Sequence, residues 1–337
     1  MRYHVEGSYR PVLFAVLIFL LTNSPLCSAQ DAPQPQPAPG IQQKPQTLPT
    51  SPTPQTRTPA PAQTAPAPTA PGQPVAAKTD HPIPVDAEHH FHQGVAFERE
   101  GNAENAIAEY QAAIKVYPDY FEARYNLGRL YLDHQGYAEA IAELKEAVRI
   151  KPDDANAHNN LGLALKHNRD LNGAISEYQK AVILNPKMAS AQNNLANVLY
   201  IRRDYNGAIQ HYKAALALQP NSAETHMNLG SVLDDAGRPD EAIAEYKEAI
   251  RLQPKNASAH YNLSIVYQKK KDMTMAIAEL RQAAKYAPDW PTPHIMLTNL
   301  LKESDPKAAL DECVIADGLT QDAKLHDECQ ELQRKAR

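Results

Sequence analysis

The chain has 337 residues, a formal net charge of −5 and only 7% aromatic residues. No stretch combines a basic patch with interleaved aromatic residues, which argues against a nucleic-acid-binding protein. The sequence also lacks the G-x-S-x-G, H-E-x-x-H and P-loop motifs. We therefore expect a protein that is not an enzyme, with no catalytic residues, no cofactor and no small-molecule substrate.

The first 29 residues are organised like a secretory signal. Arg2 and Arg10 supply positive charge, residues 11–21 are an apolar run, and small residues lead to a cleavage site near Ala29. The run is shorter than the roughly 20 apolar residues that cross a bilayer. We expect cleavage and an exported protein, periplasmic or secreted. One alternative is an uncleaved N-terminal anchor, through which the protein would contact a membrane. Another is lipid attachment at Cys27, although Leu26 just before it is bulkier than such sites favour.

Residues 30–86 are expected to be a disordered linker rich in Pro, Ala, Gln and Thr. They hold 16 of the 28 prolines and contain no Phe, Trp or Tyr. Such a segment cannot bury enough apolar surface to offset its conformational entropy. We expect an extended chain of polyproline-like character.

From there on, alanine and proline recur every 34 residues. A fixed period of this length predicts a stacked array of repeats. Two alanine columns and one proline column keep the register: Ala106, Ala140, Ala174, Ala208, Ala242 and Ala276; Ala113, Ala147, Ala181, Ala215, Ala249 and Ala283; and Pro118, Pro152, Pro186, Pro220, Pro254 and Pro288.

Each unit is predicted to be a helix–turn–helix hairpin. In residues 121–154, apolar side chains have helical spacing over 122–133 and again over 137–150. Gln135 and Gly136 break the pattern, Pro152 ends the second helix, and Asp153 and Asp154 can cap the next one. Small residues on the first helix, such as Gly162, and the alanine columns on the second should let the helix axes approach closely, and large residues such as Tyr178 should fill the holes between them.

These motifs resemble the tetratricopeptide repeat family. The residues that carry the resemblance are Leu127, Gly128, Tyr131, Ala140, Leu144 and Pro152. The resemblance implies an all-α, right-handed α-solenoid of six repeats, at residues 87–120, 121–154, 155–188, 189–222, 223–256 and 257–290. The family's early tryptophan is replaced by polar residues, which suggests a more polar helix contact; they are His90, Arg124, His158, Gln192, His226 and His260.

One polar residue per repeat points away from the apolar stripe of the first helix: His92 in the first repeat and an asparagine in each of the other five. The row consists of Asn126, Asn160, Asn194, Asn228 and Asn262, with Arg129 and Asn197 expected nearby. In this family the first helices line a concave groove, so the row is a candidate binding site for an extended peptide. It resembles the asparagine ladder in the repeat superhelix of O-linked N-acetylglucosamine transferase, without a catalytic domain. The alternative is that these amides bond locally.

Residues 291–337 are expected to be a degenerate seventh repeat with a closing helix. We expect one helix near residues 293–302, a second over 307–316 that ends at Gly318, and a third over 320–335. Cys313 and Cys329 could form a disulfide between the last two, since export leads to an oxidising compartment. The alternative is that the two cysteines remain free thiols.

His89, His90 and His92 open the array but lack a second ligand cluster, so we expect no metal site. The sequence thus indicates a non-catalytic scaffold that binds protein or extended peptide partners, in the cell envelope or outside the cell. The alternative function is a structural or accessory subunit of a larger envelope complex. The sequence does not identify the partner.

Overall fold

The computed structural model describes residues 82–335. The expected signal, residues 1–29, and nearly all of the expected linker, residues 30–86, lie outside the described residues. The first helix begins at Val85, two residues before the expected start of the first repeat.

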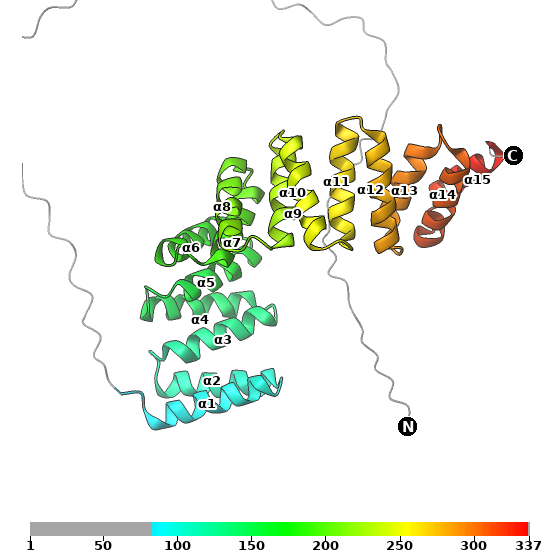
Figure 1. The fold of residues 1–337 in the computed structure, drawn as a ribbon. Helices are drawn as coiled ribbons and strands as arrows, with labels where there is room; N and C mark the ends of the chain where they lie inside the picture. Colours follow the sequence, from blue (N-terminus) through cyan, green and yellow to red (C-terminus); the bar gives the residue numbers. More distant parts are fainter. Residues whose placement is uncertain (1–81, 336–337) are drawn as a thin grey trace, which may run out of the picture. The chain divides into compact units, whose positions relative to one another are not determined.

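Every secondary-structure element of residues 82–335 is helical. The helices are α1 (Val85–Arg99), α2 (Ala103–Val116), α3 (Phe121–Asp133), α4 (Tyr137–Ile150), α5 (Ala155–His167), α6 (Leu171–Leu184), α7 (Ala189–Ile201), α8 (Tyr205–Leu218), α9 (Ala223–Asp235), α10 (Pro239–Leu252), α11 (Ala257–Lys269), α12 (Met273–Tyr286), α13 (Pro291–Leu301), α14 (Pro306–Thr320) and α15 (Ala323–Lys335). Odd and even neighbours form hairpins, and each hairpin packs on the next in chain order (Figure 1). The predicted all-α solenoid is confirmed.

Local sequence signals explain the helix ends. Of the two candidate caps, Asp153 and Asp154, it is Asp154 that caps α5, by accepting a hydrogen bond from the Ala157 amide. Inside each hairpin the turn uses one residue of positive φ at a constant register: Gly101, Gln135, Arg169, Arg203, Gly237 and Lys271. Only two of these six are glycines, so the array accepts the left-handed conformation at four positions that carry a side chain.

Close helix contacts at small residues hold each hairpin together. The two alanine columns are buried, and the first-helix glycines lie directly under large side chains of the second helix. A Cβ placed on Gly162 would lie 2.8 Å from Cδ1 of Tyr178, and one on Gly128 would lie 2.6 Å from Cγ of Leu144. These distances are shorter than relaxed packing allows, so a side chain at either position would force the facing side chain of the second helix to shift.

A polar clasp joins the two helices of each hairpin where the family usually has tryptophan. In the third repeat, His158 Nδ1 lies 2.5 Å from Glu177 Oε2, and His158 Nε2 lies 3.0 Å from the carbonyl oxygen of Pro152. The hydrogen bond to Glu177 raises the pKa of His158. Equivalent clasps are His90–Glu109, Arg124–Glu143, Gln192–His211, His226–Glu245 and His260–Glu279. The expected polar contact is confirmed.

The C-terminal end differs from the prediction at Gly318. This residue lies inside α14, which continues to Thr320 and ends at Gln321, the residue with φ of 53°. The Thr320 hydroxyl donates to the Ala316 carbonyl, and the Asp322 carboxylate accepts from the Lys324 amide at the start of α15. A single exposed glycine does not end a helix when the cap lies three residues later.

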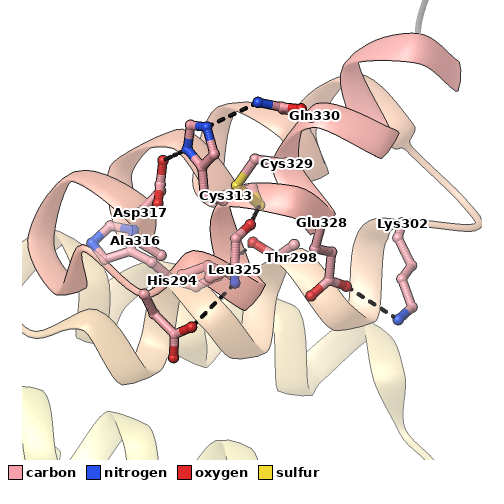
Figure 2. The surroundings of a disulfide bond; sticks show 12 residues. His294, Thr298, Lys302, Cys313, Ala316, Asp317, Leu325, Glu328, Cys329 and Gln330 are labelled. Carbon is pink, nitrogen blue, oxygen red and sulfur yellow. Dashed lines mark hydrogen bonds and ion pairs between the residues drawn. A yellow bond between two sulfur atoms is a disulfide. The ribbon is translucent and has the colours of Figure 1, made fainter.

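A disulfide joins Cys313 of α14 to Cys329 of α15, with the Cα atoms 5.6 Å apart (Figure 2). Both cysteines are buried in a cluster that includes Leu325. His326 accompanies the link, with Nδ1 2.8 Å from Asp317 and Nε2 2.9 Å from the Gln330 amide. The closing helix is therefore fastened to α14 by covalent, apolar and polar contacts.

Candidate interaction surface

The first helices of successive repeats pack side by side and form one continuous surface. α3, α5, α7, α9 and α11 contact one another directly, in addition to the hairpin contacts, whereas second helices do not contact one another to the same extent. In an array of hairpins, the helices that contact the equivalent helices of the adjacent repeats lie on its inner side. Here these are the first helices. We call the exposed part of these five helices the inner face.

All five asparagines of the predicted row lie on the inner face and are half-buried. Two of them bond to the preceding repeat: Asn160 donates to the Tyr125 hydroxyl at 3.0 Å, and Asn194 donates to the Asn159 Oδ1 at 3.0 Å. These amides link consecutive first helices, as the local-bonding alternative supposes.

The remaining members of the row are less engaged. Asn126 makes one long contact, 3.4 Å from the Tyr110 hydroxyl. Asn228 and Asn262 form no side-chain hydrogen bond within residues 82–335, so their amide groups are available at the surface. The row is thus structural near its middle and free toward α9 and α11.

The other two predicted residues are occupied by intramolecular partners. Arg129 pairs with Glu98 of α1 and with Asp133 of its own helix. Asn197 accepts a hydrogen bond from the hydroxyl of Tyr212. Both residues border the inner face, but each would have to exchange an existing contact for a ligand.

Sequence reasoning missed two polar bridges that connect first helices. The Tyr200 hydroxyl donates to Asp235 at 2.7 Å, and Lys269 Nζ lies 2.6 Å from Asp234 Oδ2. Burial, followed by the contact with Asp235, raises the pKa of Tyr200 and keeps its proton in place. No repeating column marks these residues, because each bridge uses different side chains at neighbouring registers.

The described residues contain no group of three His, Cys, Asp or Glu side chains that could hold a metal ion. His90 of the N-terminal histidine cluster instead contacts Glu109 across its hairpin, 2.6 Å away. Among residues 82–335, no helix is long and apolar enough to cross a membrane.

The repeats match known sequence profiles over most of their length. One profile described as tetratricopeptide repeat matches residues 75–121, 93–155, 125–189 and 227–291, and a second matches residues 187–255. The chain belongs to the tetratricopeptide repeat family. Repeats of this family form scaffolds that typically bind other proteins or peptides, and the repeat profiles include no catalytic domain.

Solved structures share the fold. A tetratricopeptide repeat protein from Parabacteroides merdae has 15% identity and a TM-score of 0.55, covering 73% of this chain and 98% of its own. The pilF protein of Pseudomonas aeruginosa has 23% identity and a TM-score of 0.53, covering 63% and 96%. A MamA protein has 26% identity and a TM-score of 0.48, covering 51% and 94%. No curated protein sequence matches the chain.

Proposed function

We propose that this protein is an exported, non-catalytic scaffold whose inner face binds an extended segment of a partner protein. The observation that carries the proposal is the pair of half-buried amides of Asn228 and Asn262 on adjacent first helices, which form no side-chain hydrogen bond among residues 82–335. A primary amide both donates and accepts, so it can pair with one peptide group of a bound chain. Two such amides in successive repeats would hold a backbone with little regard to its side chains.

Affinity capture with the full chain as bait tests this function. We expect Asn228→Ala combined with Asn262→Ala to lose partners that the wild-type chain retains, because the bound backbone loses two hydrogen-bonding sites. Asn206→Ala is the matched control, since Asn206 is an exposed asparagine on the second helix α8. If the double variant retains every partner that the control retains, the inner face is not the binding site and a structural-subunit role is favoured.

The proposed export rests on the order of residues 1–29, and the linker role on the composition of residues 30–86. The mature protein should begin near Gln30, and protease should cut residues 30–81 well before it cuts the helical repeats. N-terminal sequencing of the exported protein that finds Met1 or Arg2 would contradict cleavage. An intact 30–81 segment after limited proteolysis would contradict the disordered linker.

We further propose that the Cys313–Cys329 disulfide is present in the mature protein. Export would place both cysteines in an oxidising compartment, where such bonds persist. Their Cα separation of 5.6 Å lies within the range that a disulfide spans without backbone movement. Thiol titration of the denatured, unreduced protein should find no free thiol from this pair, and two free thiols per mature chain would disprove the link.

A further inference from the structure

Lys166 and Tyr178 of the third repeat both lack a polar partner among residues 82–335. Lys166 lies half-buried near the end of α5 and forms no ion pair or hydrogen bond within the described part of the chain. Burial is the sole cause that shifts its pKa, and it lowers it. The hydroxyl of Tyr178 is fully buried and has no hydrogen-bond partner among residues 82–335. The ammonium group can only donate and the hydroxyl can donate, so one acceptor group could satisfy both.

The first repeat shows which group fills the corresponding place. The ring of Tyr110 has the same placement as that of Tyr178, because a Cβ on Gly94 would lie 2.7 Å from Cδ1 of Tyr110. Glu98 stands 12 residues before Tyr110, and its carboxylate accepts from the Tyr110 hydroxyl at 2.8 Å. The same carboxylate also pairs with a cation, Arg129.

In the third repeat, the residue at the position of Glu98 is Lys166. A cation therefore stands where the first repeat places the acceptor for the tyrosine hydroxyl. The other nearby position, 15 residues before the tyrosine, provides Asn197 for Tyr212 and Ser231 for Tyr246. In the third repeat this position is Leu163, which has no polar group.

Two other cationic side chains of the inner face, Arg129 and Lys269, form ion pairs with carboxylates. Arg129 pairs with Asp133 as well as with the first helix, and Lys269 pairs with Asp234. Lys166 lies between these two pairs in the chain and has no such counter-ion within residues 82–335. Placing a carboxylate at this point would compensate the one cation that the array leaves half-buried without a partner.

We propose that Lys166 and Tyr178 together receive the side-chain carboxylate of an aspartate or glutamate in the bound partner segment. The carboxylate takes the role that Glu98 has in the first repeat, accepting from the ammonium group and from the hydroxyl. Because that hydroxyl is buried in the free chain, the ammonium makes the first contact, and the hydroxyl is reached after the side chains that cover it move. This inference rests on the peptide-binding function proposed above.

A side-chain carboxylate fits better than a chain terminus. Lys166 stands in the middle of the asparagine row, with Asn126 on one side and Asn228 and Asn262 on the other. A partner that ended at Lys166 would leave one side of the row empty. A segment that continues past Lys166 can use amides on both sides.

Selection of random dodecapeptides displayed on phage against the full chain supplies a defined probe. We expect the selected peptides to share an acidic residue at one position. Replacing that residue by its amide in a synthetic peptide should weaken binding by about tenfold, since a hydrogen bond to a charged group contributes about 1.5 kcal/mol or more. On the Lys166→Gln chain the acidic and amide peptides should bind equally. Tyr178→Phe should reduce the difference between them, and Lys166→Glu should select a basic residue at that position.

Lys187→Gln is the matched control, because Lys187 is an exposed lysine in the loop between α6 and α7. It should preserve the preference for the acidic peptide. If peptides are selected that depend on Asn228 and Asn262 but have no acidic preference sensitive to Lys166 and Tyr178, this inference fails and the proposed function stands. If no selected peptide depends on the two asparagines, both fail together.

Discussion

The third and fourth repeats, α5–α6 and α7–α8, have the same frame but different internal chemistry. Both turn through an arginine of positive φ, Arg169 or Arg203, and both cap the second helix with an aspartate, Asp170 or Asp204. Both also place a fully buried tyrosine at the same register of the second helix. The shared columns therefore fix the hairpin, and they leave the residues between the columns free to vary.

The two repeats differ in their polar contacts: the histidine of the clasp is on opposite helices, and the hydrogen bonding of the tyrosine hydroxyl is not the same. The clasp of the third repeat has histidine on the first helix and its acceptor, Glu177, on the second. In the fourth repeat His211 is on the second helix and Gln192 on the first. Among residues 82–335, the tyrosine hydroxyl of the third repeat has no partner, whereas that of the fourth is bonded to Asn197. A repeat array can thus exchange donors and acceptors pairwise without changing its backbone.

Overpacking the small residue of the third repeat should produce the largest effect. Gly162→Leu adds a side chain where a Cβ alone would lie 2.8 Å from the Tyr178 ring. We expect the free energy of unfolding to fall by about 3 kcal/mol, as measured by urea denaturation of the full chain. Gly318→Leu is the control, because nothing lies within 4 Å of a Cβ there. An unchanged midpoint for Gly162→Leu would contradict the placement of this residue between helices.

The clasps of the third and fourth repeats have their histidine on opposite helices, and they should make the stability of the fold depend on pH in opposite directions. The hydrogen bond to Glu177 raises the pKa of His158 above 6.5, so its stabilisation is present below that pH and is lost as pH rises through the folded-state pKa. Burial lowers the pKa of His211 below 6.5, so its contribution is present above that pH and is lost as pH falls through the folded-state pKa.

Substitution of each histidine by glutamine tests this difference. His158→Gln should cost about 1.5–3 kcal/mol at pH 5.5, the size of a hydrogen bond between charged groups, and less at pH 8. His211→Gln should cost more at pH 8 than at pH 5.5. Urea denaturation at both pH values measures the changes, and slopes of the same sign for the two variants would refute the assignment.

The sequence predicts the features that all repeats share, and it does not predict the side-chain contacts that differ between repeats. Six copies of the alanine and proline columns determine the hairpins, and the glycine–tyrosine contacts follow from residue size. The hydroxyl of Tyr178, which has no partner among the described residues, depends on Leu163 and Lys166, at positions where the residue type varies from repeat to repeat. The partners of Asn160 and Asn194 belong to the preceding repeat, so the bonds appear only when adjacent helices are placed. Gly318 misled the prediction because helix ends depend on caps as well as on glycine.

Removing each tyrosine hydroxyl should have the smallest effect and should distinguish the two repeats most directly. Tyr212→Phe deletes the donor to Asn197 and leaves that half-buried amide oxygen without it, so we expect a loss of about 1 kcal/mol. Tyr178→Phe deletes a buried hydroxyl that has no partner among the described residues, so the desolvation cost disappears with it and stability should be unchanged or slightly higher. Urea denaturation of the two variants in parallel measures the difference. Equal losses would show that Tyr178 has an acceptor in the free protein, and the place proposed for a ligand carboxylate would then already be filled.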